Sequence, residues 1–167
     1  MAQTFTLNSS TIGVDLNNGN ATALFAVGTH VLGSNDTEWV YVQANTSILP
    51  YRMVAFNAAG TCGMASASDL LNGLQLGLAQ TSISSQAYGW VAIRGIGLTV
   101  QTTGSATATA QGIYLAASGT PTGVLSNVAS ASGTVAGISF TDVSTQTAVS
   151  TLTTATLSWP RGGAPGM

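Results

Sequence analysis

The sequence contains no lysine and little charge of either sign. Only 5% of its 167 residues are Asp, Glu, Lys or Arg, against about 25% in an average soluble domain. The three cations are Arg52, Arg94 and Arg161. Proteins bind nucleic acid non-specifically by neutralising phosphates with Lys and Arg, so three scattered arginines argue against a DNA or RNA partner. They argue equally against a polybasic site for a membrane surface.

Cysteine and histidine are also scarce, with one of each, Cys62 and His30. A single cysteine forms no disulfide within the chain, and these two residues cannot build a Cys/His zinc site. We therefore expect no metal and no cofactor. The N-terminus lacks the basic and apolar regions of a signal peptide, and no apolar run is long enough for a membrane helix. We expect a chain made in a cytoplasm.

Hydrophobic residues are abundant despite the missing charge. They make up 45% of the chain, and the mean hydropathy is +0.36. Disordered chains combine low hydrophobicity with high net charge, so this composition favours a folded domain. The 24 Thr and 18 Ser provide polar surface in place of charges, and Thr suits a pleated, half-buried sheet surface.

The apolar pattern is that of short strands separated by Gly, Asn, Pro and Ser. Residues 38–43 alternate, with Trp39 and Tyr41 on one face. Residues 88–100 are apolar on both faces, which predicts a strand through the centre of the sheet. A helical turn is plausible only at residues 68–73, with Ser68 as its cap and Gly73 as its stop. Many short strands at this spacing predict an all-β fold, a compact β-barrel-like sandwich with at most one short helical turn.

No residue pattern predicts catalysis. His30 lies in an apolar strand without a nucleophile motif, and Cys62 has no cation nearby in sequence to lower its pKa. Asp36 and Glu38 are the only close carboxylate pair, and a turn residue plus a solvated strand end explains them better than glycoside chemistry. We therefore predict that the chain is not an enzyme.

Aromatic residues offer the better candidates for a binding role. Charged residues are depleted and aromatic residues enriched in the cores of permanent interfaces. Trp39, Tyr41 and Tyr88 are our candidate assembly contacts. Trp90 and Trp159 lie in strongly apolar strands, and filling the chain's own core explains them at least as well.

Three groups of residues carry a family resemblance. They are Gly33-Ser-Asn-Asp-Thr-Glu-Trp-Val-Tyr-Val-Gln43, then Gly77-Leu-Ala-Gln80 with Tyr88-Gly-Trp-Val-Ala-Ile-Arg-Gly95, then Val135-Ala-Gly-Ile138 with Leu157-Ser-Trp-Pro-Arg161. Their order and spacing resemble the small head decoration, or cement, proteins of tailed phages, over residues 30–161.

The resemblance implies a β-tulip domain at residues 30–161, preceded by an N-terminal arm or first strands at 1–29 and followed by a loose C-terminal tail at 162–167. It implies homotrimers on the outer surface of the virion capsid, where they bridge capsomers of the major capsid protein. Catalytic residues are not part of the family pattern.

Two other functions remain open from the sequence. One is another β-domain of the virion, in a tail, fibre or baseplate, although the chain shows neither repeats nor a heptad stalk. The other is a carbohydrate-binding surface module that uses Trp39 and Tyr41 as a sugar platform. Enzymatic turnover ranks last and would have to involve Asp36, Glu38 or His30.

Overall fold

Strands form almost all of the regular structure, as the sequence predicts. The computed structural model describes residues 15–103, 113–115, 123–126, 134–140 and 151–163. The all-β prediction with one short helix is confirmed within these residues. The elements are β1 (His30–Leu32), β2 (Glu38–Ala44), β3 (Met53–Phe56), β4 (Thr61–Met64), α1 (Ala67–Leu71), β5 (Gln75–Ala79), β6 (Tyr88–Thr102), β7 (Ile113–Leu115), β8 (Leu125–Ser126), β9 (Thr134–Phe140) and β10 (Thr151–Gly163).

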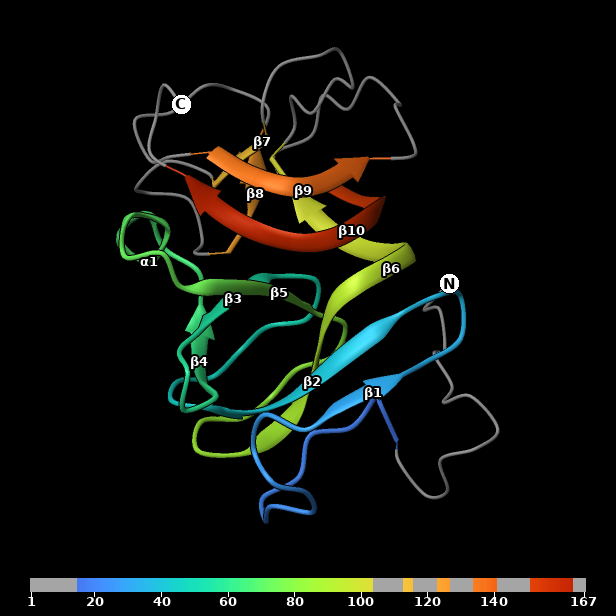
Figure 1. Ribbon diagram of the computed structural model, residues 1–167, viewed down its shortest axis with the longest axis vertical. Coiled ribbons are helices and arrows are strands. Elements are labelled where there is room, and N and C mark those ends of the chain that lie inside the picture. The colour runs from blue at the N-terminus through green and yellow to red at the C-terminus, as the bar shows by residue number, and fades with distance from the viewer. Residues whose placement is uncertain (1–14, 104–112, 116–122, 127–133, 141–150, 164–167) are drawn as a thin grey trace.

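The long strand β6 joins two rings of strands. Its first half pairs with β2 and β5, and the order β2-β4-β3-β5 closes a ring of five strands with it. Its second half pairs with β10 and β8, and β9 and β7 close a second ring. Figure 1 shows β6 passing from the half of the molecule that holds β1–β5 to the half that holds β7–β10. The central position predicted for this apolar strand is correct.

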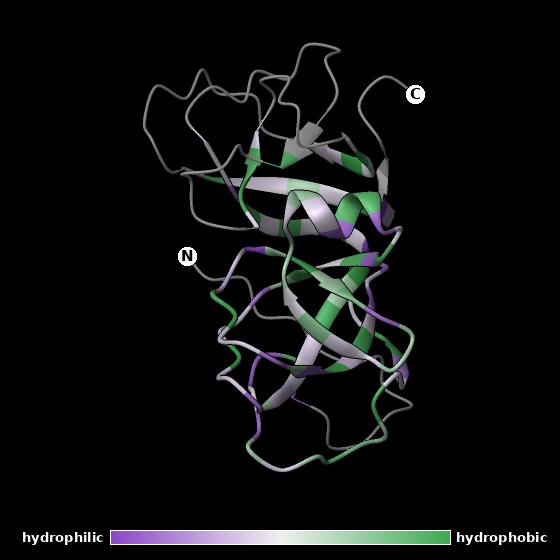
Figure 2. Cartoon of the chain, turned by 90° about the vertical axis from the view of Figure 1, so that its left-hand side faces the viewer, coloured by the Kyte–Doolittle hydropathy of each residue, from purple (hydrophilic) through white to green (hydrophobic). Residues whose placement is uncertain are grey.

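One core cluster takes residues from one face of every strand in the first ring, as the interior of a closed ring does. Figure 2 shows hydrophobic residues along the strands of this half. The strand residues of this cluster are Val40, Val42 and Ala44 from β2, Val54 and Phe56 from β3, Cys62 from β4, Ala79 from β5, and Val91 and Ile93 from β6.

The opposite faces of β2, β3, β5 and β6 belong to a second core cluster, which continues into the other ring. Segments outside the strands cover it. Leu16 is buried there, and Phe25 packs against it. Leu16 and Phe25 thus anchor part of residues 15–29, the stretch expected to be an arm or first strands, on this cluster. Residues 1–14 lie outside the described chain.

The last strand continues beyond the predicted end of the domain. Gly162 pairs with Val135 and Gly163 with Thr134, so β10 includes two residues of the expected loose tail. A Cβ at Gly162 would lie 2.6 Å from Cα of Leu70 in α1. Glycine therefore lets the helix pack directly on this strand. Residues 164–167 lie outside the described chain.

The short helix begins two residues earlier than the sequence suggests. Ser66, rather than Ser68, is its N-cap. The Ser66 backbone N–H and hydroxyl donate to Asp69 Oδ2 at 2.8 and 2.6 Å, in the manner of a capping box. Gly73, the expected stop, follows the helix with a φ of +66°.

Candidate functional site

Two of the three predicted contact residues are buried. Trp39 and Tyr41 have 0% of their surface exposed, so they offer no atoms to a partner, and their prediction as assembly contacts is wrong. A sugar platform made of these two rings is excluded for the same reason. Tyr88 is partly buried, with its ring stacked 6.1 Å from that of Tyr41.

The physical reason is that both faces of β2 are covered. The side chains on the other face fill the first ring, while Phe25 packs edge-on against Tyr41 at 5.4 Å. The hydroxyl of Tyr41 accepts a hydrogen bond from the Leu24 N–H at 3.1 Å, and the Trp39 indole N–H donates to Thr37 Oγ1 at 2.9 Å. The polar ends of both rings thus have partners inside the molecule.

Trp159 is the exposed tryptophan of the described chain, with 49% of its surface accessible. Strand alternation predicts it on the buried face with Ala155 and Leu157, which are 0% and 2% exposed. The ladder between β10 and β9 is irregular here. Leu157 pairs with Ile138 and Arg161 with Ala136, so three residues of β10 oppose Gly137 alone. This bulge turns the indole outward.

The backbone at Trp159 is strained as well as bulged. Its φ is +45°, a region that bulky L residues rarely adopt. Such conformations cost about 1–3 kcal/mol and persist only where the surroundings impose them. They are concentrated at functional sites, which makes the surface around Trp159 the strongest candidate in the described chain.

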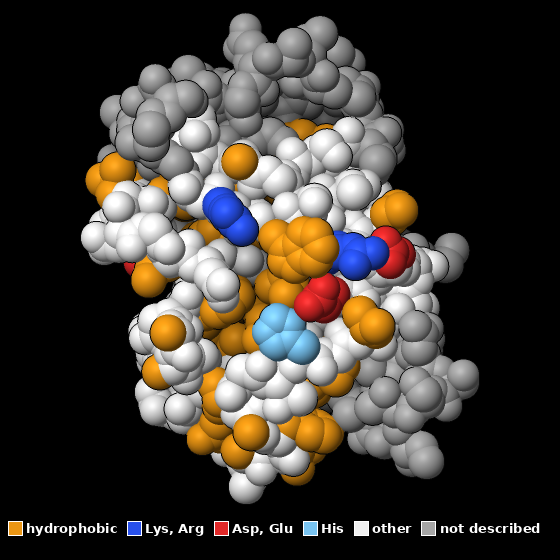
Figure 3. Space-filling view, in the orientation of Figure 1, with side chains coloured by type: hydrophobic (Ala, Val, Ile, Leu, Met, Phe, Trp, Pro, Cys, Tyr) orange, Lys and Arg blue, Asp and Glu red, His pale blue; other side chains and the backbone are white. Residues whose placement is uncertain are grey.

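Charged residues gather around this indole although the chain has few of them. The cluster comprises Trp159 with His30, Asp36, Glu38, Arg94 and Arg161, and we refer to it as the Trp159 cluster. Figure 3 shows charged side chains of both signs on this face, next to an apolar hollow. The residues come from β1, β2, β6, β10 and the turn before β2.

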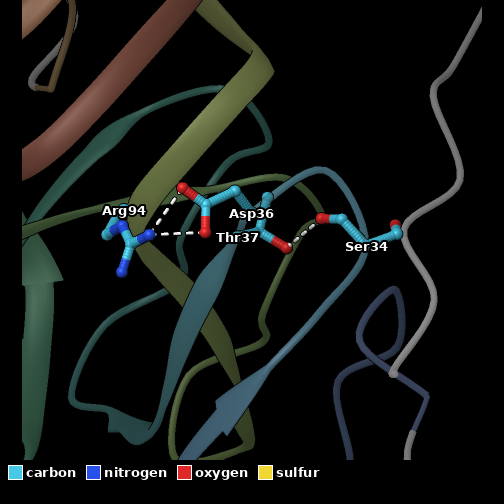
Figure 4. A network of polar contacts seen from close by, with 4 residues as sticks. All are labelled: Ser34, Asp36, Thr37 and Arg94. Carbon is cyan, nitrogen blue, oxygen red and sulfur yellow. Dashed lines mark hydrogen bonds and ion pairs between the residues drawn. The ribbon is translucent and has the colours of Figure 1, made fainter. Parts of the chain in front are cut away.

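Arg94 is the link between the two rings. Opposite it lie Glu38 on β2 and Ser158 on β10, so it stands where β6 leaves one ring and enters the other. Its Nη2 donates to both carboxylate oxygens of Asp36 (Figure 4). Its Cζ lies over the Trp159 ring, 5.3 Å from the centroid, within the range of a cation–π contact. The hydrogen bond and charge of Asp36 raise the pKa of Arg94 above its ordinary value.

A tight turn aims Asp36 at Arg94. The Thr37 N–H and Oγ1 both donate to Ser34 O, at 3.2 and 2.6 Å, and Figure 4 shows Ser34 and Thr37 on the far side of Asp36 from Arg94. Asn35 and Asp36 have φ values of +57° and +55°, which Asn and Asp tolerate better than other residues. Asp36 is thus part of a turn, as predicted, and also an ion-pair partner.

His30 and Glu38 form the second pair of the cluster. His30 Nδ1 lies 3.0 Å from Glu38 Oε1, on the neighbouring strand. The histidine is exposed, as is Leu32 on the same face of β1, so this face of the strand is not covered by the core. Each carboxylate of the predicted pair therefore has its own basic partner.

Cys62 is buried inside the first ring. Burial raises the pKa of its thiol to about 12, so the reactive thiolate is not formed near neutral pH. Among the described residues, no group of three or more His, Cys, Asp or Glu side chains could hold a metal ion. In the same residues, no helix is long and apolar enough to cross a membrane.

Comparison with known proteins gives no assignment. The chain matches no protein family, and no characterised protein shares significant sequence similarity with it.

Proposed function

We propose that this chain is a structural protein that binds the outer surface of a tailed-phage capsid and stabilises contacts between neighbouring capsomers. Its partners are the major capsid protein and other copies of itself, assembled as a homotrimer. The resembling segments support the proposal because they lie mainly on strands that are neighbours in the structure, namely β2, β5, β6, β9 and β10. In the described sheet, β6 pairs with β2, β5 and β10, and β9 pairs with β10.

The observation that carries the proposal is the near absence of charge on the rest of the described surface. Outside the Trp159 cluster, the described charged residues are Arg52, which is buried, and Asp15 and Asp69. The exposed surface includes large apolar side chains instead, among them Leu24, Leu49 and Leu71. A neutral surface with apolar anchors is what the core of a permanent interface requires.

Weak contacts suffice for a protein that bridges a lattice. When one copy touches several capsomers, each further contact forms at a high effective concentration, and the total affinity exceeds that of any single contact. Contacts between neutral surfaces are also insensitive to salt, since screening acts on charges. Occupancy on the capsid should therefore change little as the ionic strength rises.

The test is to titrate the protein onto capsid shells, stripped of it, from the phage that encodes it. We expect saturable binding that survives moderate salt. A strong loss of occupancy at moderate salt would contradict the neutral interface, and intact virions without density outside the shell would contradict the proposal itself.

Matched variants then locate the interface. Leu24, Leu49 and Leu71 are each replaced by Asp and, as a control of nearly the same shape, by Asn. Where one of these leucines contacts the capsid, we expect its Asp variant to lose occupancy, because a charge is desolvated there, while its Asn variant keeps more of the occupancy. Normal binding by all three Asp variants would remove these positions from the interface.

A further inference from the structure

A hollow of about 230 Å³ lies beside Trp159. Its apolar lining comes from buried side chains at the junction of the two rings, namely Phe56, Leu76, Ile93 and Pro160. Its polar lining comes from His30, Gln75 and Arg161, which are exposed, and Trp159 forms an aromatic wall. The volume is below the roughly 300–1,000 Å³ of pockets for drug-sized ligands, so it suits one small ring.

The aromatic wall is fixed in place before any ligand arrives. The bulge and the positive φ set its backbone, and Arg94 covers one face of the indole. Asp36 holds Arg94 in turn. A ring immobilised in this way loses little conformational entropy on binding, and its uncovered face attracts partially positive C–H groups.

The polar lining offers donors and acceptors to hydroxyl groups. His30 Nδ1 lies 3.0 Å from Glu38 Oε1, which leaves Nε2 to a ligand as a donor or an acceptor. The Gln75 amide offers both functions, and Arg161 offers donors. Since a hydroxyl both donates and accepts, a polyhydroxylated ring could satisfy all three side chains, whereas an aliphatic side chain of a peptide would satisfy none.

Arg161 adds a preference for negative charge. Arg94, the other arginine of the cluster, faces the carboxylate of Asp36. Arg161 has no ion pair among the residues that the structure describes. A guanidinium pairs with a carboxylate through two parallel hydrogen bonds, so a carboxylate on the ligand would complete the site.

We propose that the hollow beside Trp159 binds one pyranose residue of an acidic glycan. The C–H face of the sugar packs on the indole, its hydroxyls bond to His30 and Gln75, and its carboxylate pairs with Arg161. This site is independent of the proposed capsid function, because it uses the charged cluster rather than the neutral surface and because purified protein suffices to test it.

The test uses two monosaccharide probes, glucuronate and glucose, observed by saturation-transfer NMR with the full chain. We expect both to bind and glucuronate to bind more tightly. Arg161→Gln should lower the affinity for glucuronate about tenfold, the effect of losing one charged hydrogen-bond pair, and leave glucose unchanged. Trp159→Ala should abolish both, while Leu152→Ala, another exposed apolar residue of β10, should change neither.

Three results would overturn the proposal. The first is that neither sugar binds saturably. The second is an equal loss for both sugars in Arg161→Gln, which would indicate a structural role for the arginine. The third is tighter binding of a capped Leu-Glu dipeptide than of glucuronate, which would assign the hollow to a protein partner.

Discussion

Replacing Gly137 with alanine should destabilise the domain through the bulge that exposes Trp159. Gly137 has a φ of +76°. A Cβ there would overlap the carbonyl oxygen of Ser158 and lie 3.1 Å from that of Trp159. Both obstacles are backbone atoms of the bulge, so no side-chain rotation relieves them.

The magnitude has two parts. The left-handed backbone of a non-glycine residue costs about 1–2 kcal/mol, and forcing extra atoms into a packed site costs about 1–3 kcal/mol more. Gly73→Ala separates the two, because Gly73 has a similar φ of +66° and no atom within 4 Å of a new Cβ. We expect Gly73→Ala to lower the free energy of unfolding by about 1–2 kcal/mol and Gly137→Ala by about 2–5 kcal/mol.

Urea denaturation followed by circular dichroism measures both values. Acrylamide quenching adds a local readout, because Trp39 and Trp90 are 0% and 1% exposed and Trp159 dominates the accessible emission. We expect Gly137→Ala to alter the quenching and Gly73→Ala to leave it unchanged. If Gly137→Ala cost no more than Gly73→Ala, the bulge would not depend on this close approach, and the account of Trp159 exposure would fail.

The sequence predicts more of the strand arrangement than of the site. Composition and alternation were enough to predict an all-β fold, and the two apolar faces of residues 88–100 were enough to place β6 at its centre. These signals work because the period of a strand is local. Closure of the rings depends on pairings between distant segments, such as the parallel pairing of β2 with β4, and no local pattern specifies those.

The sequence favours an exposed Trp39 and offers the core as an explanation for Trp159, and the structure shows the reverse for both residues. Trp39 follows a polar turn, which favours exposure, but Leu16 and other residues of the preceding segment pack into its cluster. Trp159 continues the buried face of β10, but three bulged residues change the alternation. The available signals were weak: Pro160 directly follows Trp159, and Gly137 lies in a facing strand. Sequence alone does not pair those two strands.

The members of the Trp159 cluster are separated by up to 131 positions, from His30 to Arg161. The pair Asp36 and Glu38 is visible in the sequence because only Thr37 separates the two residues. Their basic partners were not, because His30 and Arg94 reach them across strand pairs. The same residues that suggested a carboxylate pair thus each face a basic side chain, Asp36 with Arg94 and Glu38 with His30.

Two further perturbations test the interior that supports this surface. Thr37→Val removes the hydroxyl that bonds Trp39 and Ser34 and should lower the free energy of unfolding in urea by about 1–3 kcal/mol, whereas Thr37→Ser should recover part of the loss. Cys62 predicts a pH dependence, because its folded pKa of about 12 lies above its ordinary value of 9.0. Between these values the unfolded chain loses the thiol proton and the folded chain keeps it, so stability falls as the pH rises. From pH 8 to pH 11 the free energy of unfolding should fall by about 2–3 kcal/mol for this reason. The Cys62→Ala variant should lack this part of the pH dependence. If the free energy of unfolding changed equally with pH in the two proteins, the thiol would ionise as readily inside the ring as in water.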